Sequence, residues 1–168
     1  MASRFDGAFT AYRIVRADVP VFDGAGAYRW GARWTSPGRY VIHAAESYAL
    51  AVLENLVHFN LGELPPRLVV ARMDIPGEVS REVLSIDEVA GWNLAAPYTA
   101  SREYGDRWYD AERSAVLVVP SVLSPYECNV LINQQHAQSR LIEVAEPVSV
   151  SLDERLRLLL AGGGPRRS

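Results

Sequence analysis

A long segment rich in glycine, proline and aspartate, Asp18 to Gly38, most constrains how this chain can fold. Connections of this length without secondary structure are uncommon in compact domains, and they often carry functional groups. A predicted strand, Tyr40 to His43, follows at once. A predicted helix, Glu46 to His58, comes next, with apolar residues at helical spacing. The sequence therefore predicts a loop, a strand and a helix in direct succession.

The residues from Gly24 to Glu54 favour a binding site within this succession. Small residues let a backbone approach a ligand closely, arginine grips anions through paired N–H donors, and a lone carboxylate stabilises positive charge. This stretch contains Arg33 and Glu54, together with the aromatic residues Tyr28, Trp30 and Trp34. It therefore predicts a site for an anionic, ring-containing ligand.

The remainder of the chain alternates short strands with few helices. Strands are predicted at Leu68 to Ile75, Ala115 to Val119 and Asn129 to Ile132, with extended structure over Arg140 to Val150. Helices are predicted at Ser85 to Gly91, Ser101 to Ala111 and Ser151 to Leu160, the last with a Ser151–Glu154 capping box. The pattern indicates one α+β domain over residues 1–160, and we expect the tail, residues 161–168, to be disordered.

Composition excludes several classes of function. The net charge of −3 gives no electrostatic reason for a nucleic-acid or membrane surface. All 17 basic residues are arginine, which excludes a Schiff-base or P-loop lysine. Cys128 is the only cysteine, so we expect no intrachain disulfide and no cysteine-based metal cluster. The first residues do not resemble a signal peptide, so a cytoplasmic protein is expected.

Three candidate residues each have two interpretations. Arg33 is either a clamp on a pyrophosphate or carboxylate, or a surface arginine stacked on Trp34. Glu54 is either a solvated helix position or a stabiliser of a cation. Ser121 follows a strongly apolar strand, so its hydroxyl either contacts a ligand at the strand end or forms a turn. No G-x-S-x-G motif surrounds it, which argues against a serine hydrolase.

Other polar residues favour structural roles. Asn129 and Asn133 flank a short strand, where asparagine often forms turns. His43, His58 and His136 could be combined with Glu54 as metal ligands, but no H-E-x-x-H motif is present, so no metal site is predicted.

Several short motifs, in order, resemble the RES domain, the toxin half of RES–Xre toxin–antitoxin modules in bacteria. The resemblance runs from about Tyr12 to Leu156. Its motifs are Tyr12-Arg13, Ala32-Arg33-Trp34 with Gly38, Ala44 to Glu54, Gly105 to Trp108, Val119-Pro120-Ser121 and Asn129 to Asn133. Each is weak alone, and their shared order makes the match specific.

The resemblance implies an ADP-ribosyltransferase-like fold with a central mixed sheet and flanking helices. It implies NAD⁺ as a substrate rather than a cofactor, with cleavage of the nicotinamide–ribose bond by hydrolysis or phosphorolysis. The alternatives are transfer of ADP-ribose to a protein target, and a non-catalytic binding domain. Carried over by position, Arg33, Glu54 and Ser121 are the catalytic candidates. The candidates for substrate binding are Arg13, Arg33, Trp34 and His43.

The sequence departs from the family pattern at one position of the candidate site, and the resemblance also implies a partner. His43 stands where the family usually has tyrosine, and an imidazole is smaller and titrates near neutrality. The implied partner is an Xre-type helix-turn-helix antitoxin that itself binds DNA, so no direct nucleic-acid contact is expected of this chain. A homodimer and a larger hetero-oligomer with the antitoxin both stay open.

Overall fold

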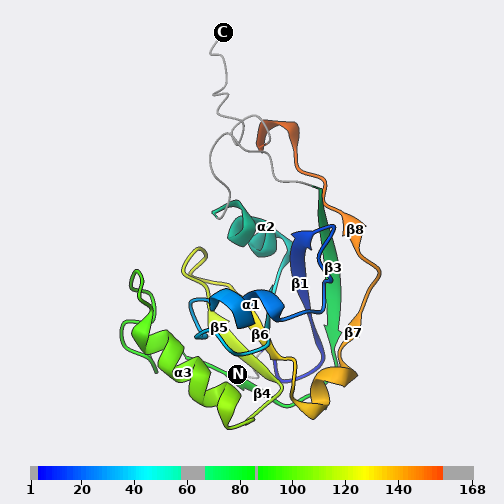
Figure 1. The fold of residues 1–168 in the computed structure, drawn as a ribbon. Coiled ribbons are helices and arrows are strands. Elements are labelled where there is room, and N and C mark those ends of the chain that lie inside the picture. The colour runs from blue at the N-terminus through cyan, green and yellow to red at the C-terminus, as the bar shows by residue number, and fades with distance from the viewer. Residues whose placement is uncertain (1–3, 58–66, 86, 157–168) are drawn as a thin grey trace.

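The computed structural model describes residues 4–57, 67–85 and 87–156 (Figure 1). The elements, in chain order, are β1 (Phe9–Arg16), α1 (Ala25–Trp30), β2 (Val41–Ala45), α2 (Tyr48–Leu56), β3 (Leu68–Ile75), β4 (Arg81–Val83), α3 (Thr99–Asp110), β5 (Val116–Pro120), β6 (Cys128–Asn133), the 3₁₀ helix η1 (Ala137–Leu141), β7 (Glu143–Val144) and β8 (Val148–Ser149). None of the helices in this part of the chain combines the length and apolarity needed to cross a membrane.

One mixed sheet organises these elements. Its strand order is β4-β5-β6-β2-β1-β3-β7, with β8 also paired to β3. The pair β4–β5 is parallel, and the other pairs are antiparallel. The prediction of a single α+β domain with a central mixed sheet and flanking helices is confirmed.

Strand pairing is extensive in most of the sheet but short between β1 and β2. β1 and β3 pair along their whole length, from Phe9 opposite Ile75 to Arg16 opposite Leu68. β2 and β6 pair at five positions. Within the described residues, β1 and β2 pair at one position alone, Tyr12 opposite Ala45. The two strands therefore diverge beyond this point.

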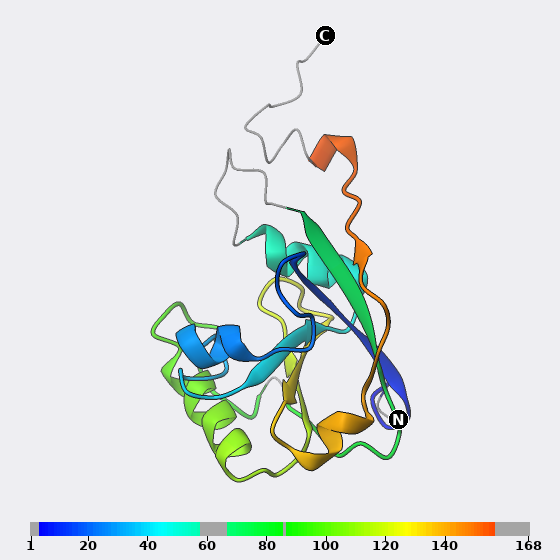
Figure 2. The same cartoon turned by 45° about the vertical axis from the view of Figure 1, so that its right-hand side comes forward.

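The α-helices pack on one face of the sheet. Successive strand residues point to opposite faces, so Val41 and Ala45 of β2 share a face that Ile42 and Ala44 do not. Val41 packs in a cluster with α1 and α3, and Ala45 packs in a cluster with α2. Ile42 and Ala44 instead pack with Phe5 and other residues on the opposite face. Figures 1 and 2 show α2 separated from α1 and α3 along this sheet.

Apolar sequence explains the central strands. In β5, the four residues Val116 to Val119 are fully buried, as a continuous apolar run predicts for a strand covered on both faces.

In α2, Ser47 caps the helix because its Oγ accepts a hydrogen bond from the Leu50 N–H at 3.0 Å. This cap, two residues after the end of β2, fixes where the helix begins.

Three sequence predictions about local structure are wrong, and a fourth is wrong in part, because η1 covers Arg140 and Leu141 at the start of the segment predicted to be extended. The segment Asp18 to Gly38 was predicted to be a loop, but it contains the short helix α1. Glycine within this helix and at both of its ends removes the sequence pattern typical of a helix. Residues 85–91 form no helix in the described positions. The described residues of this segment form turns and bends instead. This backbone lets Val89 and Trp92 pack in the apolar cluster that also contains α3.

The third wrong prediction is the capping box between Ser151 and Glu154 at the start of the last helix. Asp153, not Ser151, accepts from the Arg155 N–H at 2.9 Å, and residues 154–156 are helical. The rest of that predicted helix, residues 157–160, and the predicted disordered tail, residues 161–168, lie outside the described residues.

Candidate active site

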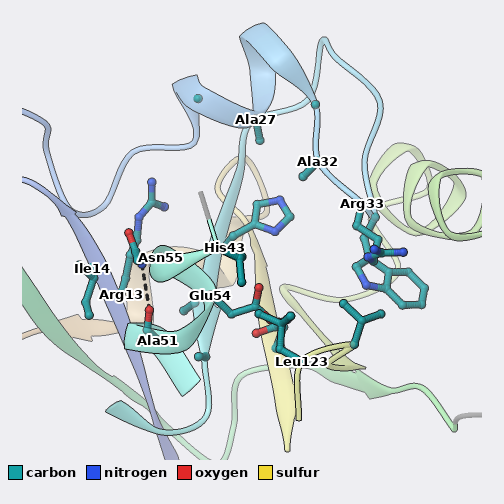
Figure 3. A pocket seen from close by; sticks show the side chains of 18 of the residues that line it. Arg13, Ile14, Ala27, Ala32, Arg33, His43, Ala51, Glu54, Asn55 and Leu123 are labelled. Carbon is teal, nitrogen blue, oxygen red and sulfur yellow. Dashed lines mark hydrogen bonds between the residues drawn. The ribbon is translucent and has the colours of Figure 1, made fainter. Parts of the chain in front are cut away.

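A cavity of about 1020 Å³ opens between the three α-helices, beside the diverging strands β1 and β2. β1 contributes Arg13, β2 contributes His43 and α2 contributes Glu54. α1 and the following loop supply one wall, and Arg102 of α3 supplies part of another. Figure 3 shows Arg13 and Arg33 at opposite ends of the cavity, with His43 and Glu54 between them. The predicted loop, strand and helix therefore do meet at one cavity.

The Glu54 carboxylate is held through one of its two oxygens. Oε1 accepts a hydrogen bond from the Ser121 Oγ at 3.0 Å and another from the Asn129 Nδ2 at 2.7 Å. No hydrogen bond to Oε2 is found within the described residues. Two donors on one oxygen fix the plane of the carboxylate and leave the other oxygen available to a ligand.

Ser121 uses its hydroxyl completely. Its Oγ accepts from the Leu123 N–H at 3.0 Å and from the Ser124 N–H at 3.3 Å, while its single proton goes to Glu54. The residue is 2% exposed. Ser121 therefore forms the turn after β5, as one of its two interpretations holds, and also orients Glu54. It is not among the residues that line the cavity, so contact with a ligand stays a prediction.

Asn129 is a site residue that the sequence interpretation missed. It lies opposite Ala45 of β2 and Val119 of β5, on the face that carries the helices, and this register directs its amide at Glu54. A polar residue at the cavity-facing position of an otherwise apolar strand was the available signal. Asn133 does form the predicted turn, because its Oδ1 accepts from the Gln135 N–H at 3.1 Å.

Arg13 and His43 bring unpaired nitrogens to the cavity. The Arg13 Nη2 donates to the Asp23 carbonyl at 2.8 Å, but its Nη1 and the His43 Nε2 are buried without a hydrogen-bond partner in the described residues. Burial lowers the pKa of Arg13 to about 10, against the opposing effect of Asp23. Burial, helped by the Arg13 charge, lowers the pKa of His43 to about 4. His43 is therefore a neutral imidazole at pH 7.

Arg33 reaches the cavity already engaged with protein groups. Its Nη1 donates to the carbonyls of Trp92 at 3.1 Å and Leu94 at 2.8 Å, and its guanidinium carbon lies 4.4 Å from the centre of the Tyr98 ring. The interpretation in which Arg33 stacks on Trp34 is not the arrangement found, because the guanidinium group stacks on Tyr98. Arg33 holds the 92–98 segment while it contributes positive charge to one end of the cavity.

The loop aromatics divide into two groups. Trp30 and Trp34 line the cavity. Trp34 is buried and stacks on Trp92 with ring centres 6.0 Å apart. Tyr28 stacks on Tyr40 at 4.4 Å and is not among the residues that line the cavity, so of the three aromatic residues in this stretch it lies outside the candidate site.

Of the other two histidines, His136 is not among the residues that line the cavity, and His58 is outside the described residues. The His136 Nδ1 accepts from the Gln138 N–H at 3.2 Å and so caps η1. His58 lies outside the described residues. Within residues 4–57, 67–85 and 87–156, no group of three or more histidine, cysteine, aspartate or glutamate side chains has the arrangement to hold a metal ion.

The cavity is positively charged, although the whole chain carries −3. Its charged residues are Arg13, Arg33, Arg102 and Glu54, which give a formal charge of +2 because His43 is neutral. None of the three arginines forms a salt bridge with a carboxylate in the described part of the chain. The cavity therefore suits an anion that presents a cationic centre to Glu54.

Known proteins are similar to this chain over most of its length. Residues 10–153 match the RES domain family. Toxin Res of Photorhabdus laumondii subsp. laumondii is 36% identical over 149 residues, covering 86% of this chain and 95% of that protein. Prs ADP-ribosylating toxin of Sphingobium sp. is 37% identical over 159 residues, covering 93% of this chain and 98% of that protein.

A solved structure shares the fold. One chain of the crystal structure of the M. tuberculosis MbcT–MbcA toxin–antitoxin complex matches with a TM-score of 0.73 and 15% sequence identity, over 92% of this chain and 90% of that chain. At this identity, the likeness establishes the fold and leaves the chemistry to be argued from the cavity itself.

Proposed function

The chain belongs to the RES domain family, and on that premise we propose that it is the toxin of a bacterial toxin–antitoxin module that depletes cellular NAD⁺. The proposed reaction breaks the bond between nicotinamide and ribose and arrests growth. It takes place in the cytoplasm, with NAD⁺ as substrate and no further cofactor.

One observation carries this proposal. Glu54 presents a single free carboxylate oxygen to a cavity lined by three arginines without salt bridges in the described residues. NAD⁺ combines a negatively charged pyrophosphate with a positively charged nicotinamide ring, so it matches both the net charge of the cavity and its lone carboxylate.

The chemistry follows from the charge on the substrate. The nicotinamide ring leaves with the electron pair of the C–N bond and departs neutral, while the ribose carbon becomes an oxocarbenium-like cation. The free oxygen of Glu54 stabilises that cation. Water or phosphate then adds to the ribose carbon from solution and gives ADP-ribose or its phosphate ester after loss of a proton.

Other residues have supporting roles in this scheme. Ser121 and Asn129 are positioning residues that hold the carboxylate. The unpaired Arg13 Nη1 is the first candidate to grip the pyrophosphate. His43, as a neutral imidazole, offers a ring face and one hydrogen-bonding nitrogen to the nicotinamide ribose or ring. Arg33 and Trp34 form the opposite end of the cavity.

Transfer of ADP-ribose to a protein is the second candidate function. A relative 37% identical is named Prs ADP-ribosylating toxin, and transfer uses the same first step with a protein nucleophile as acceptor. Incubation with labelled NAD⁺ separates the two. Free ADP-ribose or its phosphate ester indicates depletion, and a labelled protein band indicates transfer.

The proposed partner is an Xre-type helix-turn-helix antitoxin. The fold is shared with a chain from a toxin–antitoxin complex, and several relatives are named as toxins. The acidic balance of this chain is consistent with DNA contact being the task of the partner.

The decisive experiment measures nicotinamide release from NAD⁺ by the purified protein and by Glu54→Gln. We expect turnover by the wild type and a loss of orders of magnitude in the variant, with an unchanged melting temperature. Glu103→Gln, on the exposed side of α3, is the matched control and should keep full activity. Absence of nicotinamide release by the wild type would instead favour a non-catalytic binding domain, and full turnover by Glu54→Gln would refute the role of that residue.

A further inference from the structure

Arg102 is fixed in place with both terminal nitrogens unused. Its Nε donates to the Ala32 carbonyl at 2.9 Å, and its guanidinium carbon lies 5.5 Å from the centre of the Tyr98 ring. These contacts orient the guanidinium group at the cavity wall. Neither its Nη1 nor its Nη2 donates a hydrogen bond within the described residues. A guanidinium held by its Nε alone keeps the two-pronged donor pair that phosphate oxygens accept.

Two cations share one aromatic ring at this end of the cavity. Arg33 lies 4.4 Å from the Tyr98 ring centre, so Tyr98 contacts both guanidinium groups. Cation–π attraction offsets part of their mutual repulsion, but a counter-charge would offset more. The acidic residue one turn along α3 does not supply it. Asp106 accepts from the Ser36 N–H at 2.8 Å and lies 3.4 Å from the Arg39 Nη1.

Arg33 and Arg102 differ in what they can still bind. The Arg33 Nη1 already donates to two backbone carbonyls, and these bonds tie it to the 92–94 turn. Arg102 gives one nitrogen to a backbone carbonyl and leaves two for a ligand. Within the described residues, Arg33 keeps its Nε and Nη2 and Arg102 keeps both terminal nitrogens, so of the two it is Arg102 that presents its Nη1 and Nη2 together to a ligand. Arg102 comes from an element far along the chain from Arg33.

We propose that Arg102 and Tyr98 form a subsite for a phosphate oxyanion, separate from the one at Arg13. The inference rests on the proposed function and deepens it. Arg13 and Arg33 lie at opposite ends of the cavity with Glu54 between them (Figure 3), and Tyr98 joins Arg102 to the Arg33 end. The cavity therefore offers an anion site on each side of the carboxylate. The phosphate belongs either to the nucleotide or to a free phosphate ion.

Binding measured by calorimetry tests this subsite, with ADP and inorganic phosphate as separate probes. Neither probe contains the bond that the enzyme is proposed to break, so binding is independent of catalysis. The variants are Arg102→Gln, Arg102→Lys and the control Arg107→Gln, which lies on the same helix, is exposed and does not line the cavity. Melting temperatures are recorded for all of them.

We expect Arg102→Gln to weaken binding of one probe about tenfold or more, because a charge-assisted contact is lost, while Arg107→Gln binds like the wild type. Weaker ADP binding assigns the subsite to the nucleotide. Weaker binding of inorganic phosphate alone assigns it to a free phosphate ion. If Arg102→Gln does not fold, Arg102→Lys decides, because it keeps the charge and loses the two-pronged geometry and should bind the probe more weakly.

Two results would overturn the subsite: no binding of either probe by the wild type, or equal binding by the wild type and the Arg102 variants. A parallel assay of nicotinamide release keeps this test apart from the proposed function. NAD⁺ cleavage with unchanged probe binding in Arg102→Gln removes the subsite alone. If probe binding depends on Arg102 but the wild type does not cleave NAD⁺, the proposed function is refuted and the subsite stands.

Discussion

The Ser121 Oγ donates a hydrogen bond of 3.0 Å to the Glu54 Oε1, across 67 residues of sequence. Asn129 donates to the same oxygen at 2.7 Å. The helix α2 and the ends of two adjacent strands thus meet at one carboxylate oxygen. The other oxygen is left for the substrate, so the orientation of Glu54 depends on residues that themselves need not touch the substrate.

Removing either donor should therefore lower kcat more than it raises KM. We expect Ser121→Ala and Asn129→Ala each to reduce kcat for nicotinamide release by about tenfold to a hundredfold, since each removes a hydrogen bond to a charged group. Steady-state kinetics over a range of NAD⁺ concentrations measures both constants. Asn93→Ala, at an exposed position, is the control and should match the wild type. A change confined to KM would assign Asn129 to substrate binding instead.

Arg13 and Arg33 should behave differently when each is replaced by glutamine. Arg13→Gln removes the unpaired Nη1 together with one hydrogen bond to the Asp23 carbonyl, and should raise KM for NAD⁺ about tenfold or more, with a smaller effect on melting temperature than Arg33→Gln. Arg33→Gln removes the bonds to the Trp92 and Leu94 carbonyls and should lower the melting temperature. Kinetics and thermal unfolding of both variants, beside the exposed control Arg140→Gln, measure the contrast. Equal effects on stability would contradict it.

Apolar pattern predicted most of the sheet. The strand Leu68–Ile75 has the bounds expected from the sequence, because a long apolar run ends at Pro76-Gly77. The helix α1 could not be predicted in the same way. It has six residues, includes Gly26 and has Ala27 as its one buried residue, so tertiary packing rather than local preference stabilises it.

The candidate site was predictable where a residue type is unusual for its element. Glu54 stands beside an apolar helical stripe, and Ser121 follows an apolar strand. Asn129 was assigned to a turn because strand register, which aims its amide at Glu54, is set by pairing with distant strands. Arg102 gave no signal at all, since only the packing of α3 brings it to the cavity.

His43 makes stability depend on pH in a defined window. Its pKa falls from 6.5 to about 4 on folding, so the unfolded chain binds more protons between these values. The stability that depends on a neutral His43 is complete above about pH 6.5 and is lost as the pH falls toward 4. The loss reaches at most about 3 kcal/mol.

His43→Gln, which does not titrate, isolates this effect. Denaturant unfolding of the wild type and the variant at several pH values gives the difference in their free energies of unfolding. We expect that difference to shift against the wild type as the pH falls from 6.5 to 4 and to be constant above 7. A difference that does not change with pH would show that the imidazole is not held neutral.

Gly105 should be intolerant of even one added methyl group. Alanine normally stabilises a helix relative to glycine by up to about 1 kcal/mol. A Cβ on Gly105 would lie 1.8 Å from the Trp34 carbonyl oxygen, which is backbone and cannot move without displacing the cavity wall. Gly105→Ala should therefore destabilise the fold by at least about 2 kcal/mol, measured by denaturant unfolding. Gly26→Ala, in α1 with nothing within 4 Å of the added Cβ, is the matched control and should be neutral or stabilising. Equal stability of the two variants would mean that α3 does not pack against Trp34 as described.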